Sequence, residues 1–178
     1  MKLKTLVFVL VALFAVSAIG VAAAARVKGT PGDDTLNGTP QHDKIAALAG
    51  NDTVNALDGR DLVLAGRGND TVDGGAGPDW IFGGAGDDSL SGGDGRDFLR
   101  GGPGNDTLEG GSAPDVLALG RGADTANGGD GNDRIIAAAN DDAVDTIDCG
   151  PGNDVVVLNP NESDTHVNCE RVRTVGSG

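Results

Sequence analysis

An aliphatic residue recurs at every ninth position over most of the chain, set among glycine, aspartate and small polar residues. Starting at Gly29, thirteen consecutive nonapeptides run to Asp145 without an insertion. Their eighth position is aliphatic throughout: Leu36, Ile45, Val54, Val63, Val72, Ile81, Leu90, Leu99, Leu108, Leu117, Ala126, Ile135 and Val144. A single inward position between two outward ones is the period of a β-strand. The pattern therefore predicts one short strand per nonapeptide, stacked on its neighbours.

The sixth position of every nonapeptide is aspartate: Asp34, Asp43, Asp52, Asp61, Asp70, Asp79, Asp88, Asp97, Asp106, Asp115, Asp124, Asp133 and Asp142. Glycine at positions 2 and 4 supplies turn dihedrals that a Cβ would forbid. Three extra residues, Thr146 to Asp148, break the count after Asp145. A fourteenth copy, "CGPGNDVVV", then puts Asp154 and Val156 in the same roles.

This phrase resembles the G-G-x-G-x-D-x-U-x nonapeptide of calcium-binding RTX (haemolysin-type) proteins, in which U is a large apolar residue. The resemblance covers Gly29 to about Leu158. It implies an all-β fold, a right-handed parallel β-roll solenoid, in which six glycine-rich residues turn and hold calcium and the next three form a strand. Two nonapeptides make one coil of 18 residues, so about 6.5 coils at ~4.8 Å give a rod roughly 31 Å long.

In such a stack the aspartates form two columns of candidate Ca²⁺ ligands, one from the odd-numbered repeats and one from the even-numbered repeats. Neighbours in a column can hold one ion between them, with backbone carbonyls completing an oxygen shell, which allows up to about eleven Ca²⁺ ions. Ligation by oxygen alone favours Ca²⁺ over transition metals. For any single aspartate the alternative is a turn residue that caps its own backbone.

The match to the consensus is uneven along the chain. Position 4 departs from glycine at Gln41, Ala113 and Asn140, and position 2 departs at Thr30, Thr39, Leu48, Leu57 and Ala138. The block from Gly66 to Gly111 matches best. We therefore expect the firmest calcium sites at Asp70, Asp79, Asp88, Asp97 and Asp106.

Odd and even repeats also differ at their outward strand positions. Odd repeats carry threonine and small polar residues, which predicts a polar ladder on one face. Even repeats carry an apolar stripe, predicted as a partner-binding face: Leu62, Trp80, Phe82, Phe98 and Val116. An exposed stripe of this kind suits a protein partner or another copy of the chain, and the alternative is that the C-terminal tail covers it. The threonine ladder leaves ice binding or surface adhesion open as an alternative function.

The N-terminal residues 1–25 have the basic, apolar and small-residue order of a secretory signal peptide. The apolar run from Leu6 to Ala25 also leaves an uncleaved membrane anchor open. Removal of the segment takes two lysines from 13 basic residues and leaves 11 against 27 acidic ones, a net charge of −16. That balance predicts attraction of cations and no binding of nucleic acid or, after cleavage, of membranes.

Two cysteines in an exported chain predict a disulfide between Cys149 and Cys169. The expected organisation is a signal peptide over 1–25, a calcium-binding roll over 26–158 and a disulfide-linked cap over 159–178. No H-E-x-x-H or G-x-S-x-G motif is present in the sequence, and 18-residue coils are narrow for a polysaccharide-acting solenoid enzyme. The sequence thus predicts a secreted, non-enzymatic protein that folds on binding several Ca²⁺ ions and has a structural or adhesive role.

Overall fold

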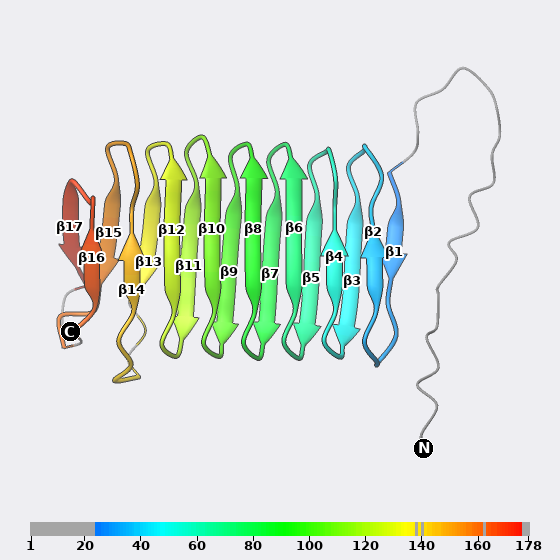
Figure 1. The fold of residues 1–178 in the computed structure, drawn as a ribbon, viewed down its shortest axis with the longest axis horizontal. Helices are drawn as coiled ribbons and strands as arrows, with labels where there is room; N and C mark the ends of the chain where they lie inside the picture. The colour runs from blue at the N-terminus through cyan, green and yellow to red at the C-terminus, as the bar shows by residue number, and fades with distance from the viewer. Residues whose placement is uncertain (1–23, 138, 140, 162, 176–178) are drawn as a thin grey trace.

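The chain winds into a parallel β-solenoid of about eight coils, in which two flat sheets face each other (Figure 1). The computed structural model describes residues 24–137, 139, 141–161 and 163–175. Within these ranges every regular element is a strand, and no helix has the length and apolarity needed to cross a bilayer. The predicted all-β solenoid with 18-residue coils is confirmed.

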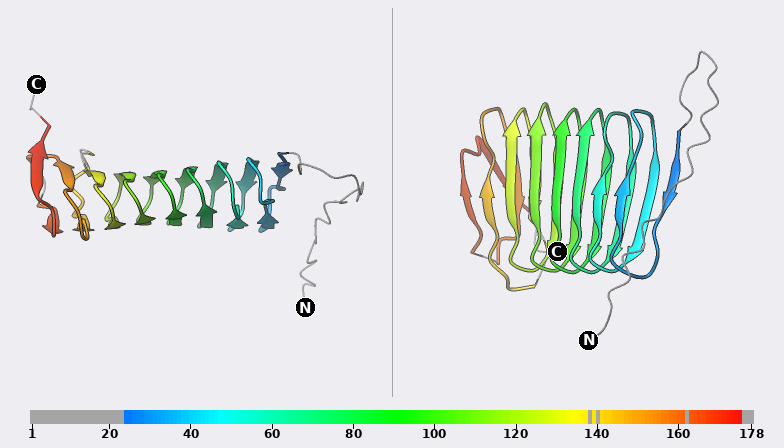
Figure 2. Two further views of the ribbon diagram at one scale, coloured as in Figure 1. Left: turned by 90° about the horizontal axis from the view of Figure 1, so that it is seen from above. Right: turned by 45° about the vertical axis from the view of Figure 1, so that its right-hand side comes forward.

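Successive strands alternate between the two sheets, so each coil contributes one strand to each (Figure 2). We call the nine-stranded sheet the A sheet; its strands are β1 (Arg26–Lys28), β3 (Lys44–Ala49), β5 (Leu62–Arg67), β7 (Trp80–Ala85), β9 (Phe98–Pro103), β11 (Val116–Arg121), β13 (Arg134–Ala137), β15 (Val155–Leu158) and β17 (Arg171–Thr174). The eight-stranded B sheet consists of β2 (Thr35–Asn37), β4 (Thr53–Asn55), β6 (Thr71–Ala76), β8 (Ser89–Asp94), β10 (Thr107–Ser112), β12 (Thr125–Asp130), β14 (Thr146–Asp148) and β16 (Thr165–Val167).

The core is a narrow double column of aliphatic side chains between the sheets. Each strand from β2 to β15 buries its eighth-position residue and exposes or half-exposes the residues beside it; β2, for example, buries only Leu36, whereas β16 and β17 are exposed throughout. Core residues of neighbouring coils stack directly, as Ile81 does on Val63 and Leu99. Because one such residue per nonapeptide is a small core, other interactions between coils have to contribute to the stability of the roll.

Most strands are longer than predicted. They comprise three residues in β2 and β4 but six in β6 to β12, because the ladder continues into the first three positions of the next repeat. The turn proper is therefore short. Its sharpness depends on residues with positive φ at positions 2 and 4, such as Gly75 at 93° and Gly77 at 116°. Leu48, Leu57 and Ala113 adopt positive φ where the repeat lacks glycine.

The register predicted for the thirteenth repeat is wrong. Asp145, and not Asp142, occupies the buried sixth position, and Ile147 replaces Val144 in the core. The three extra residues therefore lie in the turn before Asp145. This register buries an isoleucine and continues the threonine ladder through Thr146, while Val144 stays 47% exposed.

The described part of the C-terminal tail continues the solenoid at its end. Strands β16 and β17 pair with β14 and β15, respectively. The tail therefore stacks on the last coil and does not fold back over the apolar stripe (Figure 1). The predicted disulfide is present: Cys149 follows β14, Cys169 lies between β16 and β17, and their Cα atoms are 5.2 Å apart.

Candidate calcium columns

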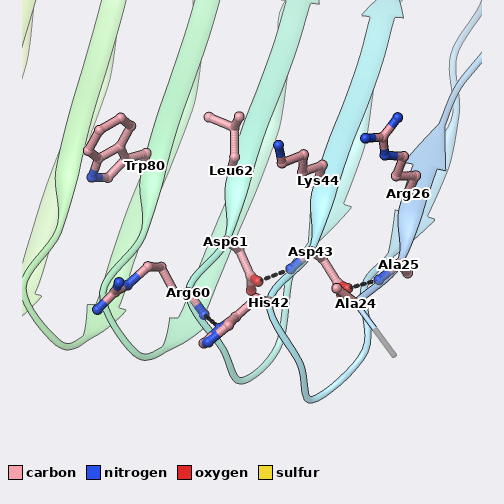
Figure 3. A pocket seen from close by; sticks show the side chains of 10 residues that line it. All are labelled: Ala24, Ala25, Arg26, His42, Asp43, Lys44, Arg60, Asp61, Leu62 and Trp80. Carbon is pink, nitrogen blue, oxygen red and sulfur yellow. Dashed lines mark hydrogen bonds between the residues drawn. The ribbon is translucent and has the colours of Figure 1, made fainter. Parts of the chain in front are cut away.

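Each sixth-position aspartate ends a turn and directs its carboxylate inward, beside the core. In one column the backbone N–H of each aspartate donates to Oδ1 of the aspartate one coil further on: Asp34 to Asp52, then Asp70, Asp88, Asp106, Asp124, Asp145 and Asp164. The second column runs in the same way through Asp43, Asp61, Asp79, Asp97, Asp115, Asp133 and Asp154 to the carboxylate of Glu170. Figure 3 shows the first bond of this second column, from Asp43 to Asp61, at 2.7 Å.

The other carboxylate oxygen, Oδ2, is buried without a hydrogen-bond partner along most of both columns. This holds for Asp52, Asp61, Asp70, Asp79, Asp88, Asp97, Asp106, Asp115, Asp124, Asp133, Asp154 and Asp164. A buried carboxylate oxygen without a donor or a cation is costly. A row of such atoms therefore indicates that a positively charged ligand belongs in the columns.

The first aspartate of each column differs from the rest. Thr30 donates its hydroxyl to Oδ2 of Asp34 at 3.1 Å, and Thr39 donates to Oδ2 of Asp43 at 3.0 Å. These two carboxylates are satisfied within their own turns. The turn-capping alternative therefore suits the first two repeats, where position 2 is threonine in place of glycine.

Backbone carbonyls approach the unsatisfied oxygens where position 1 is glycine. A Cβ on Gly74 would lie 2.8 Å from Oδ2 of Asp79 and 2.6 Å from the carbonyl oxygen of Gly92 in the next coil. At Gly92 the corresponding distances are 2.5 Å to Asp97 and 2.6 Å to the carbonyl of Gly110. Glycine thus allows a carboxylate and a carbonyl to crowd one side of the turn. Hard oxygen donors of these two kinds are the ligands that Ca²⁺ prefers.

Burial raises the pKa of the aspartates in the middle of both columns. It takes the pKa to about 7 for Asp79, Asp88, Asp115 and Asp124, and to about 6 for Asp97, Asp106 and Asp133. The backbone hydrogen bond to each carboxylate opposes this rise, and neighbouring charges, such as those of Asp61 and Asp97 beside Asp79, add to it. A cation bound in the column would favour the ionised form and reverse the shift.

The side chains alone do not form a complete metal cage. Among the described residues, no group of three or more His, Cys, Asp or Glu side chains converges on one point. Any ion in the columns therefore needs backbone carbonyls in addition to the aspartates. This requirement agrees with the predicted ligation by aspartates together with backbone carbonyls. The glycine turns would supply those carbonyls.

The structure brings twelve of the thirteen predicted ligands into the two columns; Asp142 lies in an exposed part of the long turn before Asp145. Four further acidic residues belong to the columns: Asp145, Asp154, Asp164 and Glu170. Of these, only Asp154 occupies the aspartate position of a recognisable nonapeptide. Asp164 could have been found by allowing longer turns, because it precedes Thr165 as Asp34 precedes Thr35. Nothing in the repeat indicated Glu170.

The predicted partner-binding residues lie on the outer face of the A sheet. Trp80 is 61% exposed, while Leu62, Phe82, Phe98 and Val116 are half-buried. The rings of Phe82 and Phe98 pack on each other at 5.7 Å. Trp80 is therefore the one member of the set that stands out into solvent.

No curated protein matches the sequence over its length or in part. The model of the RTX calcium-binding nonapeptide repeat matches residues 28–63, 64–99, 73–108, 82–117 and 109–144, which together span most of the solenoid. The aspartate columns, the glycine turns and this match lead to one conclusion: the chain belongs to the family of RTX calcium-binding nonapeptide-repeat proteins.

Proposed function

We propose that this protein is exported and folds by binding Ca²⁺ ions between successive coils, and that the loaded roll has a structural or adhesive role without catalysis. The observation that carries the proposal is the row of buried, unpartnered Oδ2 atoms. The ligands would be neighbouring aspartates of one column together with backbone carbonyls of the glycine turns. When bound, the ions would supply the positive charge that the columns lack.

The proposed sites are strongest between Asp79 and Asp133. Here the repeat retains glycine at position 1 in every nonapeptide except the one that begins at Leu119. The first sites, at Asp34 and Asp43, are weaker candidates because threonine hydroxyls already bind their carboxylates. Fewer ions than the predicted eleven are thus expected to dominate folding.

Export is supported by the order of residues 1–25, most of which lie outside the described residues. A chain of this acidity would cross the membrane without calcium and meet the ion outside. The disulfide between Cys149 and Cys169 is compatible with an oxidising compartment. The threonine ladder continues through Thr146 and Thr165, which lengthens the polar face without adding a second threonine per strand, so ice binding gains no support.

The proposal is tested by far-UV circular dichroism of the chain in excess EGTA at pH 8, titrated with CaCl₂ and, separately, with MgCl₂. We expect a cooperative change from coil to β-structure with Ca²⁺ alone, because each ion removes repulsion within a column and joins two coils. A full β spectrum in EGTA that Ca²⁺ does not change would mean that the roll folds without metal. That result would contradict the proposed calcium-dependent folding.

A substitution in the middle of a column can remove the charge of one carboxylate while keeping its hydrogen bond to the neighbouring coil. In Asp88→Asn the side-chain oxygen can still accept the N–H of Asp70, now at 2.9 Å, while the buried charge is lost. We expect the variant to retain more β-structure than the wild type in EGTA at pH 8, and its Ca²⁺ midpoint to rise on the order of tenfold, about 1.4 kcal/mol.

The matched control is Asp34→Asn, at the same position of the first repeat, where Thr30 already binds Oδ2. Its Ca²⁺ midpoint should stay close to that of the wild type. Titration calorimetry measures the midpoint and the number of ions for both variants. Equal effects at the two positions would contradict the assignment of the central sites.

A further inference from the structure

The two faces of the roll carry opposite charges, although the protein as a whole is strongly acidic. Of the 11 Lys and Arg residues after residue 25, nine lie on strands of the A sheet: Arg26, Lys28, Lys44, Arg67, Arg100, Arg121, Arg134, Arg171 and Arg173. All nine are exposed. No strand of the A sheet contains Asp or Glu, and no strand of the B sheet contains Lys or Arg.

The carboxylates on strands instead face outward from the B sheet, at Asp73, Asp94, Glu109, Asp130 and Asp148. The described acidic residues behind the net charge of −14 therefore lie in the turns, the columns and the B sheet, whereas the outer face of the A sheet is positively charged. The prediction from net charge that the protein repels anionic partners does not apply to this face. An anionic ligand is what the face would attract.

The cations surround an apolar centre. Along one row of the A sheet the outward residues are, from coil to coil, Arg26, Lys44, Leu62, Trp80, Phe98, Val116 and Arg134. Figure 3 shows the first four in line across neighbouring strands. A depression of about 530 Å³ lies beside them, lined by the side chains of Arg26, Lys44, Arg60, Leu62 and Trp80 among others. One exposed aromatic ring and three cations thus line the same depression.

We propose that the outer face of the A sheet binds a linear acidic polysaccharide along the axis of the roll. Its carboxylate or sulfate groups would pair with the arginines and lysines, and the apolar side of a sugar ring would stack on Trp80. The proposal rests on the proposed function only in that the roll must be folded to align these residues.

The density of charge favours a polysaccharide over a nucleic acid. Nine strands at ~4.8 Å give a face roughly 38 Å long, or about one cation per 4 Å. Duplex DNA carries about one charge per 1.7 Å, so more than half of its phosphates along the face would lack a partner. A polysaccharide with one carboxylate or sulfate per sugar ring spaces its charges by about the length of that ring, which this face can match.

The shape of the face disfavours a membrane. Interfacial binding needs apolar side chains that penetrate roughly 5–10 Å into the bilayer. On this flat sheet Phe82 and Phe98 are half-buried against each other, and among the large apolar residues of strands β5 to β11, all of which the structure describes, only Trp80 and Leu64 are exposed, at 61% and 45%. Binding of a second copy through the same face would oppose cation to cation.

The test measures binding of the Ca²⁺-loaded chain to dextran sulfate of low substitution, with no more than one sulfate per glucose, and uses uncharged dextran as the matched polymer. We expect binding to dextran sulfate alone, weakening steeply with added NaCl. The double variant Arg100→Gln/Arg134→Gln should weaken it at least tenfold. The control Asn55→Asp/Asn127→Asp makes the same change in net charge on the B sheet and should leave binding within about twofold of the wild type.

Trp80→Ser is expected to weaken binding several-fold without changing its dependence on salt. Equal losses in the A-sheet and B-sheet double variants would overturn the proposal, since the net charge and not the face would then govern binding. Equal or tighter binding to a single-stranded oligonucleotide, or to vesicles of phosphatidylcholine and phosphatidylglycerol, would also overturn it. If light scattering shows that the wild type is a dimer and that Trp80→Ser is a monomer, the face would instead be assigned to self-association.

Circular dichroism of the same samples keeps the two proposals apart. If the roll folds in EGTA and binds dextran sulfate there, the proposed calcium function is contradicted and the polysaccharide proposal is supported. A roll that folds only with Ca²⁺ and ignores dextran sulfate would support the calcium function and defeat the polysaccharide proposal.

Discussion

Gly77→Ala is expected to destabilise the Ca²⁺-loaded roll by on the order of 3 kcal/mol. Gly77 has φ of 116°, outside the small left-handed region that other residues tolerate. A Cβ there would also collide with the carbonyl oxygen of Gly59 in the preceding coil. The strain and the collision act together, because the stacked coils leave the backbone little room to move. Thermal unfolding should show a melting temperature lower by roughly 6–12 °C.

Gly32→Ala is the matched control for this prediction. Gly32 occupies the same fourth position in the first repeat, is exposed, and would place its Cβ no closer than 3.9 Å to another atom, the hydroxyl oxygen of Thr30. Its stability should change by no more than about 0.5 kcal/mol. A similar loss in both variants would show that the cost arises from turn propensity alone and not from the stacking of coils.

Ala113 shows how a repeat without this glycine is accommodated. It stands at the fourth position with φ of 79°, closer to the left-handed region than the glycines of neighbouring turns, such as Gly95 at 132° and Gly104 at 143°. The turn has therefore changed its backbone to admit a Cβ. Gly77 lies between coils whose turns keep the glycine geometry, so the same adjustment there would have to displace neighbours on both sides.

The strict period explains why much of the fold could be predicted. A period of nine with one aliphatic and one acidic position fixes the strand spacing, the inward residues and the two columns, and twelve of the thirteen aspartates lie where the period puts them. The prediction fails where the period breaks. Between Ala137 and Asp145 the sequence offers two registers, and burial of Ile147 decides between them, a preference that depends on the neighbouring coil.

Other features could not be read from the period because they depend on how the coils stack. The unpartnered Oδ2 atoms can be recognised only once Oδ1 is seen to accept a hydrogen bond from the preceding coil, as Oδ1 of Asp79 does from the N–H of Asp61. The separation of charge between the faces was present in the sequence, but a sum of charges over the chain conceals it. Assigning Arg100 and Arg134 to one sheet and Glu109 to the other makes it plain.

The stability of the roll should depend on pH in opposite directions with and without calcium. In the metal-free roll, burial raises the pKa of Asp79, Asp88, Asp115 and Asp124 to about 7, while in the unfolded chain an aspartate titrates near 4. Between these values the folded chain binds more protons than the unfolded chain. Its free energy of unfolding therefore falls as the pH rises from about 4 to 7 and stays low above that.

Calcium reverses the sign because the ion and the proton compete for the same carboxylates. With Ca²⁺ present, ionised aspartates are the ligands, so binding releases protons and tightens as the pH rises through the same window. In EGTA we expect β-structure at pH 5 that is lost by pH 8, and in saturating Ca²⁺ we expect the melting temperature to be higher at pH 8 than at pH 5 by roughly 10 °C or more. Parallel trends in the two buffers would mean that the columns are not where calcium binds. If stability depends on pH in opposite directions in the two buffers, and both dependences weaken when Asp79, Asp88 and Asp115 are replaced by asparagine, then the buried columns bind both the protons and the ions.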